Sequence, residues 1–282
     1  MSKWILGARI KTLPAAIAPV IVGTSLADQI NFINALLALI VSLSLQIAVN
    51  YANDYSDGVR GTDSNRIGPM RLVASELATA SSVKNASFIS FFIAIIAGTV
   101  LALNTSFWLM AVGFISILAA WGYTGGKKPY GYLGFGELAV FIFFGVVATV
   151  GSYYVQVGQI SSNALLLSIP MGSLSCAILV INNLRDLHQD KLVSKRTMAV
   201  KLGDANTRIF YLLLLVIAQV SAAAVASINN YALLTLLWLP LTYSAANQVL
   251  RGASGNKLII ILGKTSRLQL LLAVTLAVSL SI

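Results

Sequence analysis

Long apolar runs recur from one end of this chain to the other, and they constrain its fold more than any other feature. A helix needs about 20 mostly apolar residues to cross the hydrocarbon core of a bilayer. On that basis the sequence predicts nine membrane spans: 12–29, 33–53, 86–104, 106–124, 136–156, 163–184, 207–227, 230–250 and 264–282. Only 10% of the residues are charged, whereas a soluble domain carries about 25%. We therefore expect an all-α polytopic membrane protein, a single integral membrane domain over residues 1–282.

The positions of the basic residues test this topology, because nine spans place successive loops on alternate sides of the membrane. One side then receives all 19 lysines and arginines, and the loops near residues 30, 105, 160 and 228 receive none. The positive-inside rule places the basic side, with the N-terminus, in the cytoplasm. The net charge of +10 is therefore interpreted as a sign of orientation in the cell membrane, and no nucleic-acid partner is expected.

Carboxylates and amides gather where the second predicted span ends. Asn50, Asn53, Asp54 and Asp57 are spaced three or four residues apart, so on a helix their side chains share one face. Carboxylates at the mouth of a membrane helix are costly to desolvate and need a partner. A divalent cation is the obvious partner. Eight of the nine acidic residues lie on the basic side, which indicates chemistry at the cytoplasmic face.

A second polar cluster follows the sixth predicted span. Asn182, Asp186 and Asp190 are spaced i, i+4, i+8, which is one stripe along a helix. If the bundle brings the two span ends together, two carboxylate faces confront one another across a central cavity that opens to the cytoplasm. Mg²⁺ fits this arrangement, because it is commonly held by one or two carboxylates together with substrate phosphates. The alternative is a set of solvated loop charges, which the repetition of the pattern disfavours.

Basic and aromatic residues accompany both clusters. The members of this group are Arg60, Arg66 and Arg71 after the first cluster, Lys195 and Arg196 after the second, and Tyr123, Lys127, Lys128 and Tyr130 in the loop after span four. Membrane topology alone explains some of the basic residues, and an interfacial position explains the tyrosines equally well. Acids and bases mixed in three loops are nevertheless what a metal-bound diphosphate needs.

In this order, the motifs resemble those of the UbiA-type intramembrane aromatic prenyltransferases. Members of that family carry an NDxxDxxxD-like motif after the second helix, a YxxxK element in a middle loop and a DxxxD motif after the sixth helix, in a nine-helix bundle. The matching residues are Asn53, Asp54 and Asp57, then Tyr123 and Lys127, then Asp186 and Asp190. One position departs from the pattern: Gly61 stands where a further aspartate is expected, and Asp63 follows two residues later. The role of Asp63 as a metal ligand therefore stays open.

Three longer strings resemble one branch of that family, the 1,4-dihydroxy-2-naphthoate polyprenyltransferases of menaquinone synthesis. They are NDYSDGVRGTDSNRIGPMR, YTGGKKPYGYLGFGE and NNLRDLHQDKLVSKRTMAVKLG. The resemblance implies transfer of a polyprenyl group from a polyprenyl diphosphate to 1,4-dihydroxy-2-naphthoate, with loss of CO₂ and pyrophosphate, to give demethylmenaquinone. It also implies that the isoprenoid tail stays in contact with membrane lipid.

The same resemblance implies roles for particular residues. Mg²⁺ is expected at Asp54, Asp57, Asp186 and Asp190, which with Lys127 and Tyr123 form the expected catalytic set. The expected substrate-binding residues, for diphosphate or naphthoate, are Asn50, Asn53, Arg60, Arg66, Arg71, Lys128, Tyr130, Asn182, Lys195 and Arg196. The cation that binds the naphthoate carboxylate is left open among Arg66, Arg71 and Lys128.

Two other functions compete with this interpretation. A prenyltransferase of the same type can act on another aromatic acid, such as 4-hydroxybenzoate, although the Gly61 and Asp63 spacing argues against it. A membrane transporter is the alternative from another class, since polar clusters in membrane helices often mark substrate paths. A transporter is expected to place ionisable groups near the bilayer midplane, whereas here they lie at one face.

Overall fold

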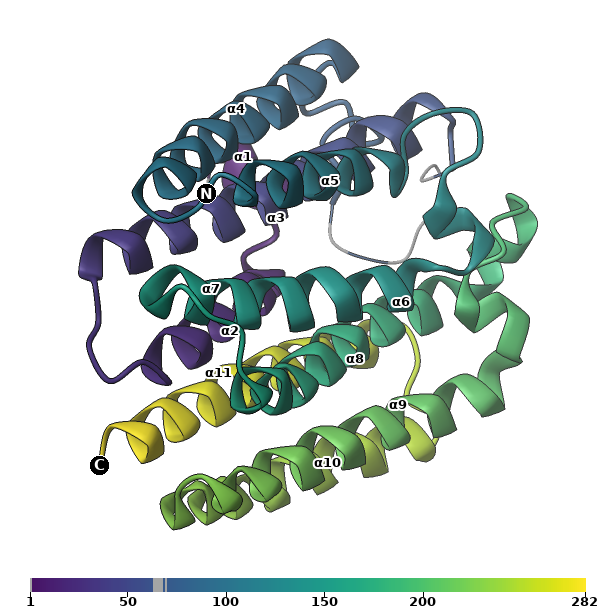
Figure 1. Ribbon diagram of the computed structural model, residues 1–282. Coiled ribbons are helices and arrows are strands. Elements are labelled where there is room, and N and C mark those ends of the chain that lie inside the picture. Colours follow the sequence, from purple (N-terminus) through teal and green to yellow (C-terminus); the bar gives the residue numbers. More distant parts are fainter. Residues whose placement is uncertain (1, 63–67, 69) are drawn as a thin grey trace.

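Every regular element that the structure describes is a helix, as the sequence predicts. The structure, a computed structural model, describes residues 2–62, 68 and 70–282 (Figure 1). In chain order the elements are α1 (Lys3–Ala8), η1 (Ile10–Thr12), α2 (Pro14–Ser25), α3 (Phe32–Val59), α4 (Ala80–Asn104), α5 (Leu109–Gly122), η2 (Tyr130–Leu133), α6 (Gly136–Val140), the π-helical η3 (Phe141–Val147), α7 (Ala148–Val157), α8 (Ser162–Leu192), α9 (Met198–Ala224), η4 (Val225–Ser227), η5 (Asn230–Trp238), α10 (Leu239–Leu250) and α11 (Asn256–Ser281).

Six of the helices in the described part of the chain are long and apolar enough to cross a membrane. They are α3, α4, the continuous segment Gly136–Val157, α8, the segment Met198–Ser227 and α11. A seventh span results if Lys3–Thr12 and Pro14–Ser25, bent by 52°, cross together. The predicted spans 106–124 and 230–250 are helical but less regular, because α5 has only 14 residues and the second is divided between η5 and α10. Six or seven candidate spans are thus found where nine were predicted.

Two helices continue well beyond the spans predicted for them. α3 runs to Val59 and α8 to Leu192, whereas the apolar sequence of each ends near residues 53 and 184. Helix α3 ends where Gly61 adopts a positive φ of 69°, and Ser194, with a φ of 59°, follows α8. Both polar clusters therefore lie on regular helix, so the three- and four-residue spacings do bring their side chains onto one face.

Helix α8 forms the centre of the bundle. Of its most apolar stretch, 78% is buried, compared with 22% for α3. Its core residues Met171 and Leu174 are fully buried, as are Leu272 and Leu276 of α11. Such a buried helix holds its polar end in a fixed place, because its axis is packed on several sides.

The polar ends of α3 and α8 meet at one end of the bundle. The same end carries the loop that follows α5 and the start of α9, on the right of Figure 1. Contact is direct, since Lys195, just after α8, lies 3.0 Å from Asp57 on α3. These four segments, together with Arg9 and Arg71, line a polar pocket.

Candidate active site

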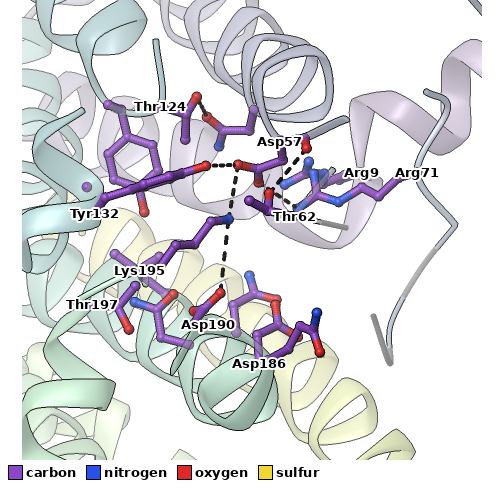
Figure 2. Close-up of a pocket in the computed structure, with 17 residues that line it drawn as sticks. Arg9, Asp57, Thr62, Arg71, Thr124, Tyr132, Asp186, Asp190, Lys195 and Thr197 are labelled. Carbon is purple, nitrogen blue, oxygen red and sulfur yellow. Dashed lines mark hydrogen bonds and ion pairs between the residues drawn. The ribbon is translucent and has the colours of Figure 1, made fainter. Parts of the chain in front are cut away.

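A small polar pocket lies between the ends of α3 and α8. Its volume is about 90 Å³, and Figure 2 shows carboxylates and basic groups facing one another across it. The lining residues are Arg9, Asn53, Asp57, Thr62, Arg71, Tyr123, Thr124, Gly131, Tyr132, Leu179, Asn182, Asn183, Asp186, Gln189, Asp190, Lys195 and Thr197. The pocket therefore unites the two predicted clusters and all three of the loops that carry basic or aromatic residues.

Asp57 occupies the α3 side of this pocket and is almost completely buried. Its Oδ1 accepts a hydrogen bond from the Tyr132 hydroxyl and another, of 3.0 Å, from Nζ of Lys195. Nη2 of Arg71 lies 3.9 Å from Oδ2. A buried carboxylate is costly unless it is paired and hydrogen-bonded, and Asp57 meets both conditions.

Lys195 connects the α3 carboxylate with the α8 carboxylate. Its Nζ lies 3.0 Å from Oδ1 of Asp57 and 4.0 Å from Oδ1 of Asp190, as the dashed lines of Figure 2 show. Burial disfavours its charge, but the carboxylates of Asp57 and Asp190 outweigh this, and the pKa of the ammonium group is raised above its ordinary value. Lys195 therefore stays charged at neutral pH and offsets part of the negative charge of Asp57 and Asp190.

Tyr132 organises the basic groups around Asp57. Lys195 Nζ lies 4.6 Å from the centre of its ring, and the Arg60 guanidinium lies 5.2 Å from it. Arg60 also donates bonds of 2.5 Å to the carbonyl oxygens of Thr124 and Gly126. Burial and the charge of Asp57 raise the pKa of the Tyr132 hydroxyl, which keeps it a proton donor.

The α8 side of the pocket presents Asp186 and Asp190 from successive turns. Both oxygens of Asp186 accept hydrogen bonds of 2.7 Å from the neighbouring Arg185. Asn183 lines the same wall and donates a bond of 2.9 Å to Oε1 of Glu137. The DxxxD stripe predicted from spacing thus faces Asp57 across the pocket.

The asparagines and Asp54 of the first cluster have different partners. Asn53 lines the pocket and accepts a bond of 2.6 Å from the Thr124 hydroxyl. Asn50 lies deeper and donates to the Ala8 carbonyl and the Thr12 hydroxyl. Asp54 does not line the pocket; its carboxylate accepts hydrogen bonds from backbone N–H groups of the loop that precedes α4.

The remaining predicted residues divide into three groups. Tyr123 lines the pocket, with its ring edge-on to Tyr130 at 5.6 Å between centroids. Lys127, Lys128 and Arg196 have exposed side chains and do not line it. Arg66 and Asp63 lie outside the described residues, so the structure does not place them.

A second, apolar cavity of about 270 Å³ adjoins the polar pocket. The two cavities share the lining residues Arg9, Asn53, Tyr123, Leu179 and Asn182. The apolar cavity is lined along α3 as far as Ala38. Since that residue precedes Asn53 by four turns, the cavity extends about 22 Å along the helix. A charged pocket and a long apolar cavity therefore lie next to one another.

Several residues of the site were not predicted from the sequence. The lining residues that were missed are Arg9, Thr62, Thr124, Gly131, Tyr132, Leu179, Asn183, Gln189 and Thr197. In the sequence, Arg9 is one of the basic residues that indicate membrane orientation, and nothing there marks it as part of a site. In the structure its backbone is left-handed, with a φ of 53°, and it lines the pocket. Tyr132 lies in the loop YTGGKKPYGY, where three tyrosines look alike in sequence and only the folded loop distinguishes them.

The oxygen-rich lining fits a hard divalent cation. Within residues 2–62, 68 and 70–282, no three His, Cys, Asp or Glu side chains form a group that could hold a metal ion by themselves. Mg²⁺ needs fewer protein ligands when substrate phosphates complete its shell. Asp57 and Asp190 both lie within 4.0 Å of the same ammonium group, so the two carboxylates face a common cationic position.

Comparison with known proteins decides the family. The model of the UbiA prenyltransferase family matches residues 16–279. The chain belongs to the UbiA prenyltransferase family. It is 48% identical to a 1,4-dihydroxy-2-naphthoate octaprenyltransferase of Mycobacterium tuberculosis over 279 residues, which cover 98% of this chain and 96% of that protein.

Solved structures agree with the UbiA assignment at the level of the fold. A UbiA homolog from Aeropyrum pernix K1 matches with a TM-score of 0.75 at 13% identity, with 99% of each chain covered. A UbiA homolog from Archaeoglobus fulgidus bound to DMAPP and Mg²⁺ matches with a TM-score of 0.69 at 12% identity, covering 98% of this chain and 99% of that one. The family and the all-helical UbiA fold predicted from the sequence are therefore confirmed.

Proposed function

We propose that this UbiA-family chain transfers a polyprenyl group from a polyprenyl diphosphate to 1,4-dihydroxy-2-naphthoate, as part of menaquinone biosynthesis. One observation carries the proposal: a pocket of facing carboxylates and cations adjoins an apolar cavity about 22 Å long. A polyprenyl diphosphate has the same two parts. The nearly full-length identity of 48% to a naphthoate octaprenyltransferase supports this acceptor.

Asp57, Asp186 and Asp190 would hold Mg²⁺, with amide oxygens of Asn53 and Asn182 beside them. When bound, the metal would draw negative charge from the diphosphate and ease cleavage of the allylic C–O bond. Lys195 and Arg71 line the same pocket and can stabilise the charge that develops on the departing pyrophosphate. The Tyr132 hydroxyl holds Asp57 in position for this task.

The apolar cavity supports the remainder of the chemistry. An allylic carbocation needs dry surroundings, because water would capture it, and the cavity walls are mainly aliphatic and aromatic. A single bond of about 1.5 Å gives an extended isoprene unit of about 5 Å, so roughly four units fill 22 Å. The rest of a longer chain would continue into membrane lipid.

The acceptor would react where the two cavities join. A new C–C bond forms at the carboxyl-bearing ring carbon, and loss of CO₂ returns the electron pair that restores the aromatic ring. Of the three cations expected to hold the carboxylate, Arg71 lines the pocket, Lys128 is exposed, and Arg66 lies outside the described residues. Of these three, Arg71 is therefore the residue that we assign to the acceptor carboxylate, in the polar pocket that Arg9 also lines.

The membrane arrangement that fits this function has nine spans, with the polar pocket on the cytoplasmic side of the cell membrane. The one-sided distribution of all 19 basic residues supports it. In that arrangement α5 and residues 230–250 cross the bilayer as short or irregular helices, which packing against neighbouring helices permits.

The test uses purified protein in lipid nanodiscs with Mg²⁺, octaprenyl diphosphate and 1,4-dihydroxy-2-naphthoate. Demethylmenaquinone, pyrophosphate and CO₂ should appear in equal amounts, and chelation of the metal should stop all three. Turnover with 4-hydroxybenzoate but not with the naphthoate would replace the proposed acceptor. Uptake of a solute into sealed vesicles, without any pyrophosphate release, would favour a transporter.

A further inference from the structure

Asp54 stands apart from the other aspartates of the two motifs. Asp54 is 1% exposed, and it lines neither the polar pocket nor the apolar cavity. Oδ2 accepts a hydrogen bond of 2.9 Å from the backbone N–H of Leu72, and Oδ1 accepts one of 3.1 Å from that of Val73. Both carboxylate oxygens are therefore committed to the loop between α3 and α4.

The surface of α3 around Asp54 is shaped to receive that loop. Gly58 lies one turn further along the same face, and a Cβ there would come within 2.5 Å of Val73. Leu72 is fully buried and packs with Tyr51 of the same helix. The loop backbone thus approaches α3 closely at just the two residues whose N–H groups Asp54 binds.

Arg71 immediately precedes the two anchored residues. Its side chain is buried, lines the polar pocket and places Nη2 3.9 Å from Oδ2 of Asp57. Asp54 and Asp57 are one turn apart on the same helix. Helix α3 therefore fixes the distance between Asp54, which binds the loop, and Asp57, which faces Arg71.

We propose that Asp54 is a positioning residue that sets Arg71 against Asp57, and that it is not a metal ligand. The inference rests on the proposed function, in which Arg71 helps to bind the diphosphate. Asp54 lines neither cavity, so a cation in the polar pocket would not reach its carboxylate, and turning the carboxylate toward the pocket would leave two buried backbone N–H groups unpaired. Binding of the metal falls instead to Asp57, Asp186 and Asp190.

The first test compares Asp54→Asn with Asp57→Asn, using Asp28→Asn at an exposed site as the matched control. The amide that Asp54→Asn introduces keeps one acceptor and turns an NH₂ group toward the other backbone N–H. We expect the KM for the prenyl diphosphate to rise about tenfold, as for one lost charge-assisted hydrogen bond, with kcat within about threefold. The Mg²⁺ concentration for half-maximal rate should stay unchanged in Asp54→Asn and rise in Asp57→Asn.

A double-mutant cycle shows whether Asp54 acts through Arg71. If it does, adding Asp54→Asn to an Arg71→Gln protein should raise KM by less than about twofold. Independent, additive effects would contradict the inference, and so would an Asp54→Asn protein that needs more Mg²⁺. Should Asp54→Asn fail to fold, Gly58→Ala displaces the loop without touching either aspartate and should give the same rise in KM.

Binding of Mn²⁺ to the protein at saturating pyrophosphate, followed by electron paramagnetic resonance, separates this inference from the proposed function. Asp54→Asn should bind Mn²⁺ as the unmodified protein does, whereas Asp57→Asn should bind it more weakly. This comparison needs no naphthoate. Loss of turnover with every acceptor would therefore defeat the proposed function, while equal weakening by the two substitutions would defeat the role assigned to Asp54.

Discussion

Each carboxylate of the candidate site has a specific cationic or hydrogen-bonding partner. Asp57 pairs with Lys195 and Tyr132, and Asp186 with Arg185. Isolated carboxylates facing one another in a membrane protein would repel and would be costly to desolvate. Built-in cations remove that cost, and they also place positive charge where a diphosphate would bind.

At the residue scale, we expect Asp57→Asn and Asp186→Asn to reduce metal-dependent turnover severely. The two substitutions remove negative charge from opposite sides of the pocket, so the loss in kcat should be on the order of 100-fold or more for each. Pyrophosphate release from the purified variants measures it, and yield from detergent-solubilised membranes checks that insertion is intact. Near-full activity in either variant would show that the two clusters do not act together.

The sequence predicted the helix faces on which these residues lie, but not all of their hydrogen-bonding partners. Asp54 and Asp57 share a helix face by spacing, and the family resemblance implied that both of them bind the metal. In the structure they have different partners, because the backbone N–H groups of Leu72 and Val73, which are distant in sequence, donate to Asp54. Tyr132 was missed for the same reason, because its contact with Asp57 is made across 75 residues.

At the scale of helices, the width of the apolar cavity depends on two glycines. Gly113 on α5 and Gly151 on α7 both line the cavity, and a Cβ added at either would meet no atom within 4 Å. Side chains at these positions would therefore enter the space proposed for the prenyl chain. Gly113 precedes Tyr123 by ten residues, which is a depth of about 15 Å.

We expect Gly113→Leu or Gly151→Leu to shorten the range of prenyl diphosphates that the protein accepts. Turnover with an eight-unit donor should fall about tenfold, whereas a two-unit donor, which ends before that depth, should react normally. Competition between the two donors measures the change. Gly263→Leu is the control, since Gly263 also has open space around it but lies outside this cavity; an equal effect there would rule out the cavity as the cause.

The extents of the helices were only partly predictable. Apolar runs located the segment Gly136–Val157 and the end of α4 closely, because hydrophobic length decides where such a helix can start and end. They did not show that α3 and α8 continue past the apolar sequence. Polar helix beyond the bilayer is stabilised by tertiary packing, which hydropathy does not report.

At the scale of the whole molecule, the bundle has a polar end and an opposite end whose loops carry no basic residues. Cys176 is the single cysteine and is buried, so an introduced cysteine can report topology without removal of the native one. Lys127→Cys should react with a membrane-impermeant maleimide only in inside-out vesicles, and Gln159→Cys only in right-side-out vesicles. Labelling of both from the same side would overturn the nine-span arrangement.

The pairing of Lys195 with both clusters has a consequence for the stability of the protein. Its pKa is raised, so its stabilising charge is fully present at neutral pH and is lost only when the pH rises through that elevated value. We expect Lys195→Met to leave Asp57 and Asp190 repelling one another, which should lower Tm by several degrees and make Tm rise with added Mg²⁺. A Tm as high as that of the unmodified protein, measured in chelator, would contradict this.

With lysine at position 195, assembly of the bundle should not wait for a divalent cation. The chain supplies from its own sequence a positive charge that pairs with Asp57 of α3 and lies near Asp190 of α8. Folding and metal loading are then separate events, and the incoming cation has to displace an internal one. The supply of Mg²⁺ would therefore govern how fast the enzyme works, but not how much folded enzyme the membrane contains.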